Sequence, residues 1–248
     1  LGGLPDGLED VTTLERVTVL HGEGVESLEP FAGLSNLRML DLSSCKSVDD
    51  LKPLAGLKKL EELVILDCGV TELGPIAGLT SLTHLDVSKT LVDDLSPLRD
   101  LASLRELSCW GTAVYDLSPL KRLEGLQSLD LGKCKSLSDV TALSCLVGLK
   151  ALNLSSCDSL VDVHVLCGLV DLHSLVLSEC RSLRDVSGLS GFVGLKSLAL
   201  HGCNSLLDIS ALSPLVGLRI LDLSLCKSLK DVSILSDLVG LERLDLSD

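Results

Sequence analysis

The sequence repeats itself from end to end with a spacing of 22 or 23 residues. Each repeat opens on the pattern Leu-x-x-Leu-x-Leu, in which valine or isoleucine sometimes replaces a later leucine. Ten full repeats begin at Leu14, Leu37, Leu60, Leu82, Leu104, Leu126, Leu149, Leu172, Leu195 and Leu218, and a partial one begins at Leu241. One such repeat is too short to bury its own leucines, so the repeats must stack on one another.

Each repeat is expected to contain a short strand, a turn and a short return segment. The alternation of apolar and polar residues in Leu-x-x-Leu-x-Leu predicts a strand with one buried face. An Asp marks the end of the turn, and in several repeats Ser and then Pro follow, which predicts an N-cap and the first position of a helix. The prolines concerned are Pro30, Pro53, Pro75, Pro97 and Pro119. About six residues then remain before the next strand, which predicts a 3₁₀ or clipped α-helical segment.

The repeat resembles the leucine-rich-repeat family, whose signature L-x-x-L-x-L-x-x-N/C-x-L recurs along the whole chain. The 22-residue repeats with the wording DLSPL are similar to internalins and to phosphatase regulatory subunits. The C-x-S-L-x-D turn is similar to the cysteine-containing branch found in F-box substrate receptors, and LSxCxSLxDVSxL to leucine-rich-repeat proteins of trypanosomatids. The resemblance implies an α/β solenoid, a curved horseshoe with a parallel sheet on the concave face and 3₁₀ or helical segments on the convex face.

We expect residues 1–248 to form a single solenoid. The chain starts in mid-repeat and stops after a bare strand, so an isolated solenoid would leave its leucine layer open to water at both ends. The expectation is therefore a fragment of a longer chain, or a subunit whose open ends are covered by further domains or subunits.

Seven of the ten cysteines occupy the position that the family fills with Asn or Cys: Cys45, Cys68, Cys134, Cys157, Cys180, Cys203 and Cys226. We interpret them as small buried side chains that donate weakly to turn carbonyls. In-register neighbours point the same way, which disfavours disulfides, and a linear ladder does not converge as zinc ligands must. Reduced thiols favour an intracellular, cytoplasmic location, with a secreted or surface form left open. Cys109 is expected in the core, and Cys145 and Cys167 partly exposed.

The sequence predicts no enzyme, cofactor or metal site. Nucleotide-binding, zinc-protease and serine-hydrolase motifs do not occur, and the five histidines, among them His21, fall at unrelated repeat positions. The recurring Asp of the turn is expected to cap its own turn or helix rather than to bind calcium. A net charge of −14 argues against nucleic acid and anionic membrane surfaces. No apolar run is long enough for membrane insertion.

Because strand side chains on the concave face are independent of the core, we expect a partner to bind there. One lane of that face is acidic in the N-terminal half, and the only Trp and Tyr of the chain lie in one repeat. The candidate partner-binding residues are Trp110, Tyr115, Asp41, Val64, Leu66, His84, Asp86, Glu106 and Asp130. Two alternatives stay open: the charges of adjacent lanes pair with each other, and Trp110 folds against Tyr115 to cover the small Cys109.

The predicted function is a non-catalytic protein-interaction module, whose acidic charge suits a partner with a basic surface. Two other roles are considered. One is a structural subunit of a large assembly that uses the convex face and the open ends. The other is a substrate-receptor or regulatory part of a ubiquitin ligase or phosphatase complex.

Overall fold

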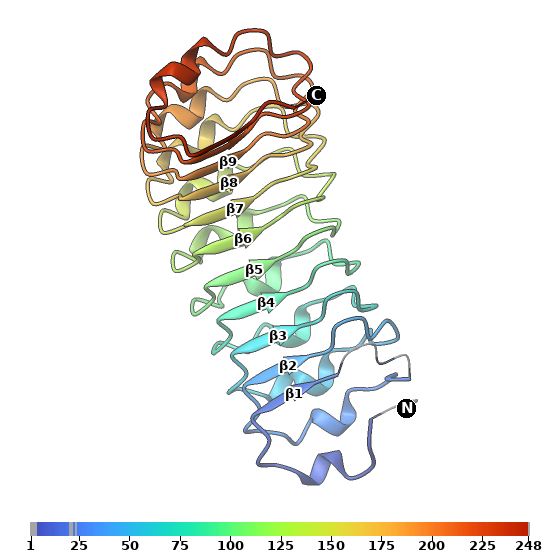
Figure 1. Ribbon diagram of the computed structural model, residues 1–248. Helices are drawn as coiled ribbons and strands as arrows, with labels where there is room; N and C mark the ends of the chain where they lie inside the picture. The colour runs from blue at the N-terminus through green and yellow to red at the C-terminus, as the bar shows by residue number, and fades with distance from the viewer. Residues whose placement is uncertain (1–3, 20–21, 23, 248) are drawn as a thin grey trace. The chain divides into compact units, whose positions relative to one another are not determined.

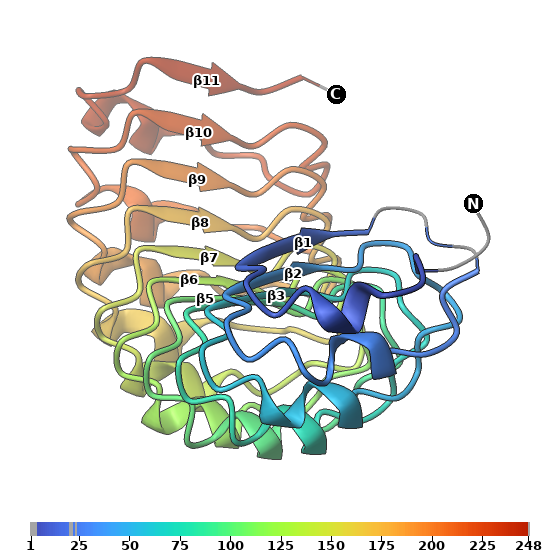
Figure 2. The ribbon, with the colours of Figure 1, turned by 90° about the horizontal axis from the view of Figure 1, so that it is seen from below.

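The computed structural model describes residues 4–19, 22 and 24–247. The chain separates into two compact units, Leu1–Gly125 (unit 1) and Leu126–Asp248 (unit 2), and each is described by itself. The single solenoid over residues 1–248 therefore stays a prediction. Within each unit, strands form one side and 3₁₀ segments the opposite side (Figures 1 and 2).

Unit 1 contains strands that pair in parallel, in chain order and in register. They are β1 (Arg16–Thr18), β2 (Met39–Asp41), β3 (Glu62–Val64), β4 (His84–Asp86) and β5 (Glu106–Ser108). The 3₁₀ segments are η1 (Leu8–Asp10), η2 (Glu29–Phe31), η3 (Lys52–Gly56), η4 (Gly74–Ile76), η5 (Ser96–Leu98) and η6 (Ser118–Arg122).

Unit 2 repeats the arrangement with parallel, in-register strands. They are β6 (Ser128–Asp130), β7 (Ala151–Asn153), β8 (Ser174–Val176), β9 (Ser197–Ala199), β10 (Ile220–Asp222) and β11 (Arg243–Asp245). The 3₁₀ segments are η7 (Thr141–Cys145), η8 (His164–Gly168), η9 (Ser187–Gly191), η10 (Ser210–Leu212) and η11 (Ser233–Asp237). The predicted solenoid of parallel strands and 3₁₀ return segments is confirmed.

Stacked aliphatic side chains form the core of each unit. In β3, Leu63 is fully buried between the half-buried Glu62 and Val64, as the alternation predicts. The aliphatic residues Leu60 and Ile65, on either side of the strand, and Leu54 of the return segment η3 are also fully buried. Each repeat thus adds one thin layer of branched side chains that contacts the layers before and after it.

The residue just before the ladder position adopts the left-handed conformation in repeat after repeat. In unit 1 these residues are Ser44, Asp67, Lys89 and Gly111, and in unit 2 Lys133, Ser156, Glu179, Gly202 and Leu225. A non-glycine residue pays about 1–2 kcal/mol for this conformation. The backbone N–H of Ser44 donates to the Leu66 carbonyl of the next repeat at 2.7 Å, so the parallel ladder continues past the strand. The turn then directs the ladder residue, such as Cys45, into the core.

The capping prediction was right for the Asp and wrong for the Ser. Asp94 Oδ1 accepts a hydrogen bond from the backbone N–H of Ser96 at 2.7 Å, and the same bond recurs at Asp50, Asp116, Asp139, Asp185, Asp208 and Asp231. Ser96 is therefore the first residue of η5 rather than its N-cap, and Pro97 is the second. The capping group is the carboxylate two residues earlier, which leaves the serine free to enter the 3₁₀ turn.

Candidate protein-binding face

The outward side chains of the strands form a surface that we call the sheet face. On unit 1 it consists of the two strand residues that flank each buried leucine, plus the residue after the third leucine of the repeat. The register places Val64 directly between Asp41 and Asp86 on the neighbouring strands. Leu66 and Trp110 continue this face past the ends of β3 and β5, and both side chains, like Val64, are partly exposed.

The predicted acidic lane has a structural task. Asp41 Oδ1 accepts a hydrogen bond from the Ser43 backbone N–H at 2.9 Å, and Asp86 Oδ1 accepts one from the Ser88 N–H at 2.8 Å. These carboxylates hold the start of the turn that follows each strand. Asp130, on β6 in unit 2, does the same for Gly132 at 2.8 Å.

Charged side chains pair on this face, but within one lane between repeats rather than between the two adjacent lanes that the sequence suggested. Glu62 Oε2 lies 3.8 Å from the Arg16 guanidinium, and Glu106 Oε1 lies 3.3 Å from His84 Nε2. In the lane beside the strands, Arg38 and Glu61 form a close ion pair. Such exposed pairs contribute little stability, about 0–1 kcal/mol each, but they orient the side chains of the face.

In each of two histidines, one ring nitrogen contacts a hydroxyl group and the other contacts a carboxylate. This arrangement resembles the triad of a hydrolase. His84 Nδ1 lies 2.8 Å from Thr83 Oγ1, whose hydroxyl donates to the Glu61 carbonyl at 3.0 Å. In unit 2, His201 lies 2.7 Å from Ser224 Oγ and 3.3 Å from Glu179.

Neither arrangement activates a nucleophile. The Ser224 hydroxyl donates to Asp222 Oδ1, so it accepts from His201 rather than giving up its proton to it. Ser224 is also 5% exposed, which closes it to a substrate. Both histidines are therefore side chains that organise the sheet face.

Trp110 and Tyr115 come from different parts of their repeat. Trp110 lies on the sheet face, where Lys89 Nζ sits 5.3 Å from the centroid of its ring, within the range of a cation–π interaction. Tyr115 is 61% exposed and lies in the segment between β5 and η6, off the strand. Its part in a partner-binding surface therefore stays a prediction. Cys109 is fully buried, as predicted.

The ladder thiols behave as the sequence predicts. Cys180 Sγ donates to the Leu154 carbonyl of the preceding repeat at 3.1 Å, and Cys45, Cys68, Cys157, Cys203 and Cys226 make the equivalent bond at 3.1–3.5 Å. Burial raises the pKa of Cys68 to about 12 and that of Cys180 to about 11. A buried thiol with a raised pKa is a poor nucleophile and a poor metal ligand. Cys145 and Cys167 are exposed.

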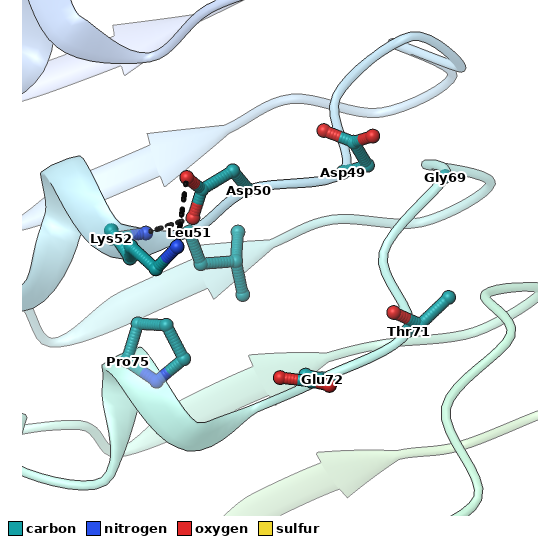
Figure 3. A pocket seen from close by; sticks show the side chains of 8 residues that line it. All are labelled: Asp49, Asp50, Leu51, Lys52, Gly69, Thr71, Glu72 and Pro75. Atoms are coloured by element: carbon teal, nitrogen blue, oxygen red, sulfur yellow. Dashed lines mark hydrogen bonds and ion pairs between the residues drawn. The ribbon is translucent and has the colours of Figure 1, made fainter.

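An open hollow of about 330 Å³ lies where the turns of two repeats meet the start of η3 and η4 (Figure 3). Asp50 lines it, but its carboxylate already accepts from the Lys52 backbone N–H at 2.8 Å and lies 3.7 Å from Lys52 Nζ. Asp49 and Glu72 stand apart along the rim (Figure 3). The hollow presents capping groups rather than convergent ligands.

Among the residues that the structure describes, no three His, Cys, Asp or Glu side chains form a group able to hold a metal ion. Within the same residues, no helix has the length and apolar character to cross a membrane. His21 lies outside the described residues.

Two residues of the face were not among the predicted binding residues. Met39 projects from β2 beside Glu62, and Lys89 covers Trp110. Met39 was detectable, since it occupies the position before the second leucine, as His84 and Glu106 do. The contribution of Lys89 was not detectable, because its position beside Trp110 depends on the left-handed turn. No residue pattern in these repeats predicts that turn.

The comparisons with known proteins agree with this architecture. Residues 28–107 match a family model described as Zer-1-like leucine-rich repeats. A search of curated proteins finds no match. An internalin (InlF) of Listeria monocytogenes is 27% identical with a TM-score of 0.85, and the match covers 96% of this chain and 68% of that one.

Two further solved structures are similar. Internalin C2 of Listeria monocytogenes is 27% identical with a TM-score of 0.69, covering 78% of this chain and 83% of that one. A leucine-rich-repeat protein of Leptospira interrogans has a TM-score of 0.56 over 100% of this chain and 81% of that one, and at 16% identity it shows the fold alone. With its recurrent signature, its in-register parallel strands and these likenesses, the chain has the leucine-rich-repeat fold and is similar to leucine-rich-repeat proteins.

Proposed function

We propose that the sheet face of unit 1 binds a protein partner without catalysis, and that Val64, Leu66 and Trp110 form the centre of the contact. The observation that carries this proposal is the partial exposure of these three apolar side chains on a face whose other described residues, Met39 apart, are polar. Interfaces are commonly built in this way, with an apolar centre inside a polar rim and an aromatic anchor.

The rim favours a partner with a basic surface. Asp41 and Asp86 flank Val64, and each has one carboxylate oxygen, Oδ2, that is not used in the turn contact with Ser43 or Ser88. Lysine or arginine side chains of a partner would find acceptors on both sides of the apolar centre. Such complementarity raises the association rate and selects among partners more than it adds affinity.

Substitutions on the face test this proposal against a matched control. The partner is recovered by affinity purification of the full-length protein from its own cells, and its affinity is measured for Trp110→Ala, Val64→Ala and Asp86→Asn. Trp110→Ala should weaken binding about tenfold or more, as truncation of an aromatic anchor does. Leu91→Ala serves as control, because Leu91 is 68% exposed in unit 1 but lies off the strands. Unchanged affinity in all three variants, or an equal loss in Leu91→Ala, would contradict the proposal.

We also infer that the protein works with reduced thiols inside a cell. The donor contacts of the ladder thiols support this, since a thiol engaged with a carbonyl in the core performs its task only while it is reduced. Mass-tag alkylation of the protein directly in its cells should label all ten cysteines after denaturation without a reducing agent. Labelling of fewer than ten cysteines would indicate that the protein resides in an oxidising compartment. The roles as assembly subunit or as part of a ubiquitin ligase or phosphatase complex stay predictions.

A further inference from the structure

Unit 2 carries an exposed row of valines on its surface. They occupy the same place in five consecutive repeats, two residues before the first leucine of the next repeat, and we call them the valine row: Val147, Val170, Val193, Val216 and Val239. Their exposed fractions are 53, 61, 67, 54 and 84%, in that order. Together they expose an apolar strip of a few hundred Å², a size that on a monomer marks an interaction site.

The fold does not require valine at this place. Each valine is the second residue of a four-residue turn, such as Leu169 to Leu172, where the Leu172 N–H donates to the Leu169 carbonyl at 3.1 Å. The same turn closes with the same backbone bond, at 2.9–3.0 Å, in four repeats of unit 1. Those repeats place Ser35, Lys58, Thr80 and Ala102 there. Unit 1 therefore shows that the turn forms without valine, and in three of the four repeats with a polar residue, so the valines of unit 2 need another explanation.

The spacing of the row suits a helix better than a strand. The parallel backbone ladder extends to the residue after the first leucine, as in the Lys196 N–H donating to the His173 carbonyl at 2.8 Å. Neighbouring valines therefore repeat about every 5 Å, and five of them span about 20 Å. Apolar residues along one face of an amphipathic helix repeat about every 5.3 Å. Alternate residues of an extended strand repeat about every 6.6 Å and lose register within two repeats.

The two flanks of the row differ in charge and size. On the strand side lie Lys150, Lys196 and Arg219, and Lys196 Nζ reaches the Gly217 carbonyl at 3.4 Å, beside Val216. Arg219 pairs with Glu242 at 3.1 Å, and the exposed Asp171 lies next to Val170. With Lys150 and Lys196 the flank keeps a net positive charge. On the other side lie small exposed residues, including Cys167, Gly168, Ser190 and Gly191. The valine row thus has small side chains along one side and basic side chains along the other.

We propose that the valine row is the docking site for an acidic amphipathic helix of a partner protein. The apolar stripe of the helix lies along the valines, and its carboxylates face Lys150, Lys196 and Arg219. A second copy of this chain is a poorer occupant. The row supplies less than the ~800 Å² per partner of a standard interface, and a symmetric contact would bring two basic flanks together. The inference concerns unit 2 and stands independently of the sheet face of unit 1.

Designed peptides test the proposal by fluorescence anisotropy on the full chain. The probe is a labelled helical peptide of about 18 residues with five leucines at helical spacing and glutamates beside them. One comparison peptide has the same composition with alternating leucines, and another has lysine in place of each glutamate. The test variant is Val170→Ser/Val193→Ser/Val216→Ser. The control is Val161→Ser/Leu207→Ser, which changes residues that are 51% and 66% exposed elsewhere on unit 2. Circular dichroism checks that both variants fold.

We expect the helical glutamate peptide to bind the wild-type chain and the control alike, and about tenfold or more weaker binding to the triple-serine variant. Both comparison peptides should bind at least about tenfold more weakly than the probe. Failure of the probe to bind, an equal loss in the control, or equal binding of either comparison peptide would overturn the proposal. So would a change from dimer to monomer in the triple-serine variant on sedimentation, because the row would then hold a second copy of the chain.

Discussion

Replacing the ladder cysteine Cys180 by alanine should destabilise the fold by about 2 kcal/mol. The side chain is fully buried, so deleting a group of about methylene size loses about 0.8 kcal/mol of transfer free energy. A void of about 20 Å³ adds about 0.5 kcal/mol. The lost thiol donation to the Leu154 carbonyl adds about 0.5 kcal/mol, at the low end, since that carbonyl still accepts from the Cys157 N–H at 3.3 Å.

Cys180→Thr should cost less than about 1 kcal/mol, because threonine already fills the ladder position elsewhere. In unit 1, Thr90 Oγ1 donates to the Val87 carbonyl at 2.6 Å. The free energy of unfolding is measured by urea denaturation under reducing conditions, with circular dichroism as the readout. Cys145→Ala, at an exposed cysteine, should stay within about 0.5 kcal/mol of wild type. A neutral Cys180→Ala, or a threonine variant less stable than the alanine variant, would refute the ladder reasoning.

Three further predictions concern the same fold. In the native protein, Cys145 and Cys167 should react quickly with a thiol reagent and the ladder thiols only after unfolding, so rapid native labelling of Cys180 would count against its burial. The free energy of unfolding should fall as the pH rises from about 8.5 towards 12. In the unfolded chain the Cys68 thiol ionises near its ordinary pKa, whereas burial holds its pKa in the folded protein at about 12. In urea titrations at pH 7.5 and 10.5, Cys68→Thr should lessen this fall. Gly188→Ala should lower the free energy of unfolding by about 1–3 kcal/mol, because the added Cβ would lie 2.4 Å from His164 Cα. The control Gly74→Ala, whose Cβ would have no neighbour within 4 Å, should be tolerated. Equal stabilities of the two variants would contradict this.

The repeat pattern was sufficient to predict most of the architecture. The period of two in Leu-x-x-Leu-x-Leu determines which side chains are buried, and Leu63 between Glu62 and Val64 follows it. The role of Cys180 was also predictable, because a small thiol in a turn that recurs in every repeat has few partners other than backbone carbonyls.

The turn chemistry was less accessible. Serine before proline normally signals an N-cap, yet Asp94 caps η5 and Ser96 lies within it. The sequence offers two capping groups, the Asp and the Ser two residues after it, and does not say which of them accepts the backbone N–H. The left-handed residue before each ladder position was also missed, because Lys89 and Leu225 have no propensity for that conformation. The stacking of neighbouring repeats imposes it.

The sequence predicted where the candidate binding residues lie, but not which contacts their side chains make. Asp41 and Asp86 lie on the sheet face as expected, while their main contacts are with the turn that follows. Tyr115 was assigned to the face only because it shares a repeat with Trp110. The valine row was not predicted because its residues lie outside the strand pattern, although LVGL and FVGL recur in the sequence.

The emission of Trp110 tests the central claim most directly, since it is the single tryptophan of the chain and lies on the sheet face. The partner recovered with the full-length protein is titrated in while tryptophan emission and acrylamide quenching are followed, with a label on the partner reporting binding separately. The partner's own tryptophans, where it has them, are replaced by phenylalanine beforehand. Binding on the sheet face should shift the Trp110 emission to the blue and protect it from acrylamide. Saturating binding with unchanged emission and unchanged quenching would contradict the proposal that this face is the binding surface.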